Sequence, residues 1–177
     1  ACGGADKKVA VFDCMSGEQH CILSTNAGVN AVLFSSNKMG AELLVAGTFG
    51  GHLHFFSLEH QGEQVGLHKF MGGRDVLAMA MCQMGKTLVV GGKANAVEVY
   101  TVMYGVAGKD IKIIEQSLLD TVGSTLSLAL NAPASVLVTG GDARVVEVWA
   151  KAIEKSSPSQ RSSTMGRRGS SMLGGGG

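Results

Sequence analysis

Proline and charged residues are both scarce in this sequence. Two of its 177 residues are proline, and Asp, Glu, Lys and Arg together make up only 16%. A chain with so little charge and 45% hydrophobic residues is not disordered over most of its length. The 15 basic and 14 acidic residues leave a formal net charge of +1, which argues against a nucleic-acid partner.

Long hydrophobic runs are also missing. The apolar stretches are short, for example 76–82, whereas a membrane-spanning helix requires roughly 20 residues. The N-terminus carries no apolar signal-peptide core. These observations predict an intracellular, cytoplasmic protein without a membrane span, with a cytoskeletal or ciliary assembly as an alternative. Because the sequence does not begin with methionine, we expect it to be an excerpt of a longer protein.

Patterns typical of metal sites and disulfides are weak. The four cysteines form no C-x-x-C pair, and we expect them to be reduced thiols that pack as small hydrophobic residues. His52 and His54 alternate along an expected strand and could share a cation. The other repeats described below carry Ala, Glu and Glu at the position of His54, so we interpret it as a variable strand position and expect the histidines to be hydrogen-bonded within the protein or solvated. We predict neither a metal nor another cofactor.

Glycine, in contrast, is abundant, and some of its 26 copies recur at a fixed period. Four segments align without gaps, namely 1–13, 45–57, 89–101 and 138–150. In each of them an aromatic residue follows a glycine by nine positions. The aligned pairs are Gly3 with Phe12, Gly47 with Phe56, Gly91 with Tyr100 and Gly140 with Trp149. Successive repeats are 44, 44 and 49 residues apart, so the chain is built from one recurring unit.

Each repeat has the pattern of a β-hairpin. An apolar run such as 87–90 leads into a glycine-containing turn, and a strand with alternating apolar residues follows, as in 96–100. A further apolar strand precedes each later hairpin, at 29–34, 76–81 and 126–130. With four strands in each period and no sustained 3.6-residue periodicity, the sequence predicts an all-β fold.

The first repeat resembles a WD40 repeat. Residues 3–13 are similar to the Gly-Ser-x-Asp-x-x-Val-x-Leu-Trp-Asp segment of that family, with Phe12-Asp13 in place of Trp-Asp. The later repeats have no Asp directly after the aromatic residue, and the Gly-His pair that is typical of the family is absent. The resemblance implies a β-propeller of about three and a half four-stranded WD40-like blades, the C-terminal part of a seven-bladed ring. Self-association of copies into a ring is the alternative.

The C-terminal segment differs in composition from the rest. We assign residues 1–153 to propeller blades and 154–177 to a disordered tail rich in Ser, Arg and Gly. Within this tail, Arg167-Arg168-Gly169-Ser170 matches the preference of basophilic kinases. Ser170 and Ser171 are therefore candidate phosphorylation sites.

The resemblance implies a non-catalytic scaffold for protein–protein interactions. We expect loops at one end of the blades to contact the partner, because loops on a rigid scaffold can vary without disturbing the core. The candidate residues are Arg74, Asp75, Lys93, Asp142 and Arg144. The expected partners are proteins or peptides, or missing blades from the same chain or another copy. The sequence has no G-x-S-x-G motif, and two alternatives stay open: a ligand-binding or catalytic propeller with its site at the channel mouth, and a purely structural packing subunit of a large assembly.

Overall fold

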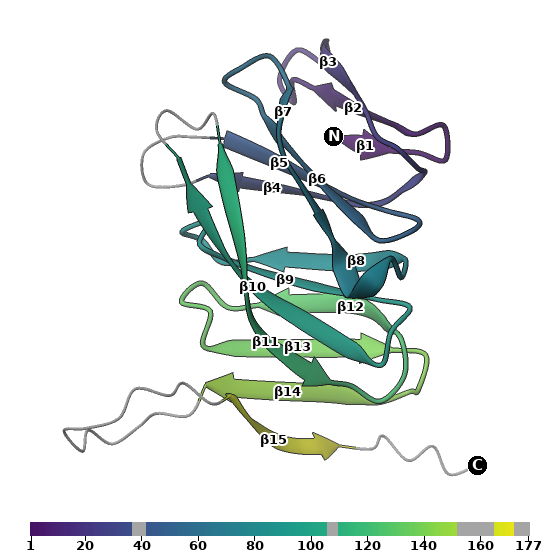
Figure 1. Ribbon diagram of the computed structural model, residues 1–177, viewed down its shortest axis with the longest axis vertical. Helices are drawn as coiled ribbons and strands as arrows, with labels where there is room; N and C mark the ends of the chain where they lie inside the picture. The colour runs from purple at the N-terminus through teal and green to yellow at the C-terminus, as the bar shows by residue number, and fades with distance from the viewer. Residues whose placement is uncertain (37–41, 106–109, 152–164, 172–177) are drawn as a thin grey trace, which may run out of the picture.

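The computed structural model describes residues 1–36, 42–105 and 110–151, together with the backbone of 165–171 (Figure 1). Apart from one 3-10 turn, η1 (Phe70–Gly72), its regular structure consists of β-strands. The strands form four antiparallel sheets that follow one another along the chain and along the long axis of the molecule (Figure 1). The prediction of an all-β fold is confirmed.

Every sheet is a meander in which each strand pairs with the next one in sequence. Sheet 1 contains β1 (Cys2–Gly3), β2 (Lys8–Phe12) and β3 (Gln19–Ser24). Sheet 2 contains β4 (Val29–Ser36), β5 (Glu42–Thr48), β6 (His52–Ser57) and β7 (Glu63–Lys69). Sheet 3 contains β8 (Val76–Met81), β9 (Thr87–Gly92), β10 (Ala96–Tyr104) and β11 (Ile111–Asp120). Sheet 4 contains β12 (Thr125–Leu130), β13 (Val136–Gly141), β14 (Val146–Lys151) and β15 (Met165–Ser171).

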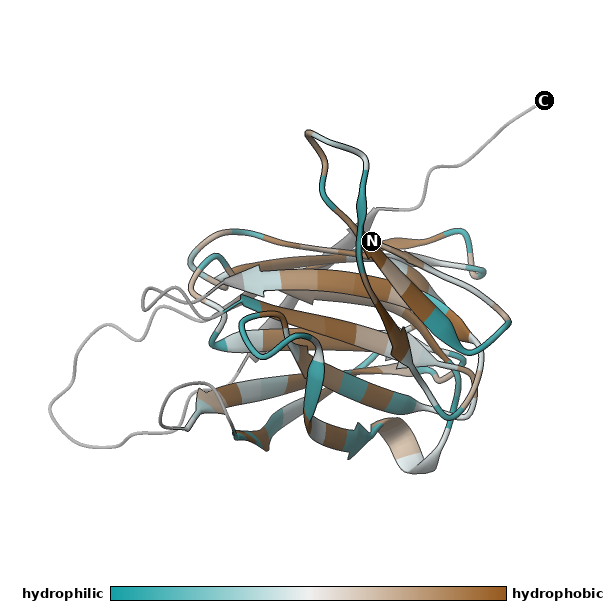
Figure 2. Cartoon of the chain, turned by 90° about the horizontal axis from the view of Figure 1, so that it is seen from above, coloured by the Kyte–Doolittle hydropathy of each residue, from teal (hydrophilic) through white to brown (hydrophobic). Residues whose placement is uncertain are grey.

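Apolar residues on both faces of the strands explain why the sheets stack. Figure 2 shows the middle of the strands as largely hydrophobic and many of the turns as hydrophilic. Successive side chains of a strand point to opposite faces of its sheet. In β10, for example, Val99 packs in the cluster between sheets 3 and 4, and its neighbour Tyr100 packs in the cluster between sheets 2 and 3. We call the face toward the next sheet along the chain the forward face and the other the backward face.

Each boundary between neighbouring sheets holds its own hydrophobic cluster. Between sheets 1 and 2 it consists of Val9, Val11, Leu23, Val29, Leu44, Ala46 and Phe56. Between sheets 2 and 3 it consists of Val45, Leu53, Phe55, Phe70, Val76, Leu88, Val90, Ala94, Tyr100 and Val102. Between sheets 3 and 4 it consists of Val89, Val97, Val99, Leu119, Leu137 and Trp149. The stability of each sheet therefore depends on its neighbours, as in repeat proteins.

The two ends of the chain contain strands, β1 and β15, that the sequence pattern did not predict. The short strand β1 gives sheet 1 a third strand, and β15 gives sheet 4 a fourth. The composition predicted disorder for 154–177, but residues 165–171 pair with β14, with Ser170 and Ser171 opposite Glu147 and Val146. Main-chain hydrogen bonds to a free strand edge need no apolar side chains, which is why composition missed this strand. Residues 154–164 and 172–177 lie outside the described part of the chain.

In the portions of the chain that the structure describes, no helix has the length and apolar character to cross a membrane.

Candidate functional site

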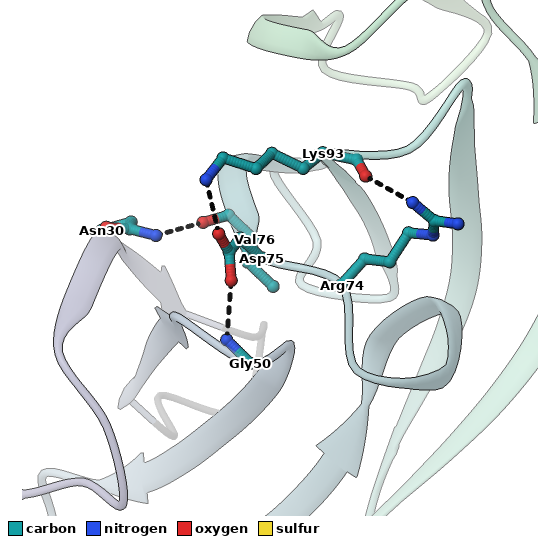
Figure 3. A network of polar contacts seen from close by, with 6 residues as sticks. All are labelled: Asn30, Gly50, Arg74, Asp75, Val76 and Lys93. Atoms are coloured by element: carbon teal, nitrogen blue, oxygen red, sulfur yellow. Dashed lines mark hydrogen bonds and ion pairs between the residues drawn. The ribbon is translucent and has the colours of Figure 1, made fainter.

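The residues predicted to contact a partner lie in turns and connections at one end of the sheets. Arg74 and Asp75 occupy the connection that precedes β8, and Lys93 occupies the β9–β10 turn. Because β8 starts and β9 ends at the same end of sheet 3, the meander brings these three residues together (Figure 3). The prediction that they share one end of the sheet is thus met by the geometry.

Asp75 is held by contacts inside the protein. Its Oδ2 forms an ion pair with Nζ of Lys93 at 2.8 Å, and its Oδ1 accepts a hydrogen bond of 2.8 Å from the backbone N–H of Gly50 (Figure 3). The hydrogen bond from Lys93, with that from Gly50, lowers the pKa of Asp75 below its ordinary value. Gly50 belongs to sheet 2 and Lys93 to sheet 3. The Asp75 carboxylate therefore joins two sheets and holds their turns in position.

Arg74 and Lys93 remain exposed around this carboxylate. Nη1 of Arg74 donates a long hydrogen bond of 3.4 Å to the backbone carbonyl of Lys93. On the other side, Nδ2 of Asn30 donates to the backbone carbonyl of Val76 at 2.9 Å and connects sheets 2 and 3 a second time (Figure 3). The exposed guanidinium of Arg74 therefore lies on a connection that several polar contacts hold in place.

Asp142 and Arg144 occupy the equivalent turn of the next sheet, between β13 and β14. Oδ1 of Asp142 accepts a hydrogen bond of 2.9 Å from the backbone N–H of Ser124, the last residue of the connection into β12. Arg144 is exposed and has a positive φ of 57°. Within the described residues, no hydrogen bond or ion pair joins these two residues to the group around Asp75. The five predicted residues therefore form two groups on neighbouring turns.

Comparison with solved structures identifies the architecture. A chain in the crystal structure of the mitotic checkpoint complex superimposes with a TM-score of 0.67 at 19% sequence identity, over 84% of this chain and 44% of that chain. The fold is part of a β-propeller. The present chain spans less than half the length of that neighbour, and at this identity the likeness shows the fold alone. No protein-family profile matches the chain, and no curated protein matches it.

The four sheets are thus propeller blades, here blades 1 to 4, and their boundaries contain polar contacts that sequence reasoning missed. Three blades carry a buried polar residue at the same position of the third strand, namely His54, Glu98 and Glu147. Each accepts a hydrogen bond from a backbone N–H in the connection that enters its blade. The donors are Asn26 to His54 Nε2 at 3.5 Å, Met71 to Glu98 Oε2 at 3.3 Å and Val122 to Glu147 Oε2 at 3.2 Å.

These contacts correct our interpretation of His54 as a variable strand position. The residue is only 4% exposed, and its two ring nitrogens have separate roles: Nδ1–H donates to Oε1 of Gln64 at 2.9 Å, while Nε2 accepts from the backbone N–H of Asn26. A buried polar group without partners is costly, so this position requires a side chain that can reach the connection. The available signal was the recurrence of polar residues at one register position in three successive blades, each between two apolar neighbours on its strand.

The burial of His54 predicts a dependence of stability on pH. Burial is the main cause that lowers the pKa of His54 below 6.5, and the neighbouring His52 lowers it further. Below pH 6.5 the unfolded chain therefore binds a proton at this residue more readily than the folded chain does. The free energy of unfolding should fall as the pH decreases from about 7.5 to about 5.5, and His54→Gln should reduce this dependence.

Chemical denaturation at several pH values measures this effect. His20→Gln is the matched control, because His20 is exposed and the substitution is the same. The explanation is wrong if His54→Gln and His20→Gln leave the same pH dependence as the wild type.

A pocket of about 360 Å³ lies at the opposite end of the boundary between blades 1 and 2. Its lining consists of Val11, Phe12, Asp13, His20, Phe34, Glu42, Leu58 and Glu59. None of the predicted partner-binding residues belongs to it. The described residues contain no group of three or more His, Cys, Asp and Glu side chains close enough to hold a metal ion.

Proposed function

We propose that the chain is a non-catalytic scaffold for protein–protein interactions, and that its partner binds the end of the blades that carries Arg74 and Arg144. The observation that carries this proposal is the pairing of exposed cations with anchored turns. Asp75 ties the connection before β8 to the turns of blades 2 and 3, and Asp142 ties the β13–β14 turn to Ser124. A turn that is already held in place loses less backbone entropy when a partner binds, so side chains on such turns suit recognition.

The chemistry of the exposed groups indicates the kind of partner. Arg74, Lys93 and Arg144 are exposed at this end, whereas the carboxylate of Asp75 is already engaged by Lys93 and Gly50. A guanidinium presents several N–H donors in a planar arrangement that matches a carboxylate. We therefore propose a protein or peptide partner that presents carboxylates to Arg74 and Arg144. The solved neighbour is a chain of a multiprotein complex, which agrees with a protein partner in general terms.

The double variant Arg74→Glu with Arg144→Glu tests this surface. We expect it to reduce binding of the partner by roughly 100-fold, because two attractive contacts become repulsive. Lys86→Glu with Lys112→Glu is the matched control, since both lysines are exposed and lie at the opposite end of blade 3. Tagged wild type and both variants are used for quantitative affinity purification from the source cells, followed by binding measurements with each purified partner.

Retention of every partner by the Arg74 and Arg144 variant would show that this end is not the binding surface. Circular dichroism and thermal melting of the same samples establish that both variants are folded. Asp75 is not included in the variant, because its replacement would disturb the boundary between blades 2 and 3.

A further inference from the structure

The forward face of blade 4 has the residues of an internal blade boundary but is exposed to solvent. It includes Leu126, Ser127, Ala129, Val138, Gly140, Val146 and Val148, which we call the open face. None of these residues is charged. Val138 pairs with Val148, and Gly140 pairs with Val146, in the register that relates Val89 to Val99 and Gly91 to Val97 in blade 3. The open face is therefore equivalent, residue by residue, to the forward faces of the earlier blades.

Solvent exposure distinguishes this face from its equivalents. Val97 and Val99 are 0% and 5% exposed, whereas Val146 and Val148, at the same register positions, are 42% and 36% exposed. Leu126 is 55% exposed. Exposed aliphatic residues that cluster in this way are typical of an interaction surface.

Gly140 at the centre of the open face shows what the face lacks. In each earlier blade, the equivalent glycine is covered by the first strand of the next blade, through Val29 and Val32 over Gly3, Val76 and Met79 over Gly47, and Thr125 and Leu128 over Gly91. At Gly140, an added Cβ would have no heavy atom within 4 Å. The three covered glycines thus define the shape that fits above the fourth.

The covering strands share a second feature, a β-bulge near their start. The register shifts between Val29 and Ala31 in β4, between Val76 and Ala78 in β8, and between Thr125 and Ser127 in β12. Residues three positions apart normally lie on opposite faces of a strand, and the extra residue of a bulge brings them to the same face. This explains how the first and fourth residues of each strand both contact the glycine.

We propose that the open face binds a further blade-like β-sheet whose edge strand is bulged and carries a β-branched residue, followed three positions later by a large apolar residue such as Val, Leu or Met. The partner chemistry follows from the three internal boundaries, because all three use this pattern. A second copy of the described chain does not supply it, since sheet 1 begins with the two-residue strand β1, which lacks the covering residues. This surface is separate from the turn end that carries Arg74 and Arg144, so either assignment can fail without the other.

A fusion protein supplies the missing sheet in a defined form. It consists of residues 1–171 followed by a second copy of residues 121–171, so that the appended Thr125 and Leu128 can cover Gly140. We expect its melting temperature to exceed that of the unextended chain by roughly 5 °C or more, because each added repeat contributes a new boundary. The matched control is the same fusion with Thr125→Asp and Leu128→Asp in the appended copy. A second control carries Gly140→Val in the first copy, and both controls should lose the increase.

Three results would overturn the proposal. The first is an equal melting temperature of the fusion and its Asp control, and the second is an undiminished increase in the Gly140→Val fusion. The third is a dimer of the unextended chain, seen in light scattering and dissociated by Val148→Lys, because a second copy would then be the occupant. If the fusion aggregates, the open face is tested in the 177-residue chain itself. Val148→Lys should then reduce the fluorescence of a bound apolar dye more than Leu67→Lys, the control at an exposed leucine of blade 2. An equal effect of the two changes would show that the open face is already covered.

Discussion

Gly47→Val should lower the free energy of unfolding by about 3 kcal/mol, whereas Gly140→Val should leave it within about 0.5 kcal/mol of the wild type or raise it slightly. A Cβ at Gly47 would lie 3.0 Å from Cβ of Val76 and 3.3 Å from Sδ of Met79, and Val76 is fully buried. The boundary between blades 2 and 3 would have to open to accept a valine.

The Gly140 variant is a close control for the Gly47 variant. Neither glycine has a positive φ, so backbone strain does not separate the two sites. Both sit at the same position of the second strand, opposite Leu53 in one case and Val146 in the other. Denaturation by urea, monitored by circular dichroism, gives both free energies. Equal losses at the two glycines would contradict the structure, because they would mean that Gly140 is also covered.

Glu98→Ala should lower the free energy of unfolding by about 3 kcal/mol, which is unusually large for a strand position occupied by a charged residue. Glu98 is 7% exposed, and its Oε2 accepts hydrogen bonds from the Tyr100 hydroxyl and from the backbone N–H of Met71. Removal of the carboxylate would leave both donors buried without this acceptor. Burial and the hydrogen bond to Glu98 raise the pKa of Tyr100, so its hydroxyl stays protonated and can donate at neutral pH.

A double-mutant cycle separates the hydrogen bond from the packing. Urea denaturation gives the free energy of unfolding of Glu98→Ala, of Tyr100→Phe and of the double variant. The sum of the losses in the two single variants should exceed the loss in the double variant. Glu98→Gln is the conservative control, because its amide oxygen can still accept from Met71. Additive losses would show that Glu98 and Tyr100 act independently and that the buried pair is not a unit.

The strands and their register were predictable because their signals are local. The alternation in 96–100 and the fixed nine-residue distance from glycine to aromatic residue act over one hairpin, and the observed strands Thr87–Gly92 and Ala96–Tyr104 agree with them. For the candidate site, the meander places Arg74, Asp75 and Lys93 together as expected. The sequence could not show that Asp75 joins two blades, because its partner Gly50 lies 25 residues away and their contact depends on how the blades stack.

By itself, the sequence determined the repeated unit, the all-β fold and which residues share a strand. Only the tertiary structure decided which of these residues are buried, since chemically similar positions in different blades have different neighbours. Val99 and Val148 occupy one register position, yet one lies between two blades and the other faces solvent. His54, Glu98 and Glu147 are buried because the preceding blade covers them, and the connection that enters their own blade donates an N–H to each. Strand β15 forms because β14 has a free edge, and no local pattern in residues 165–171 encodes that edge.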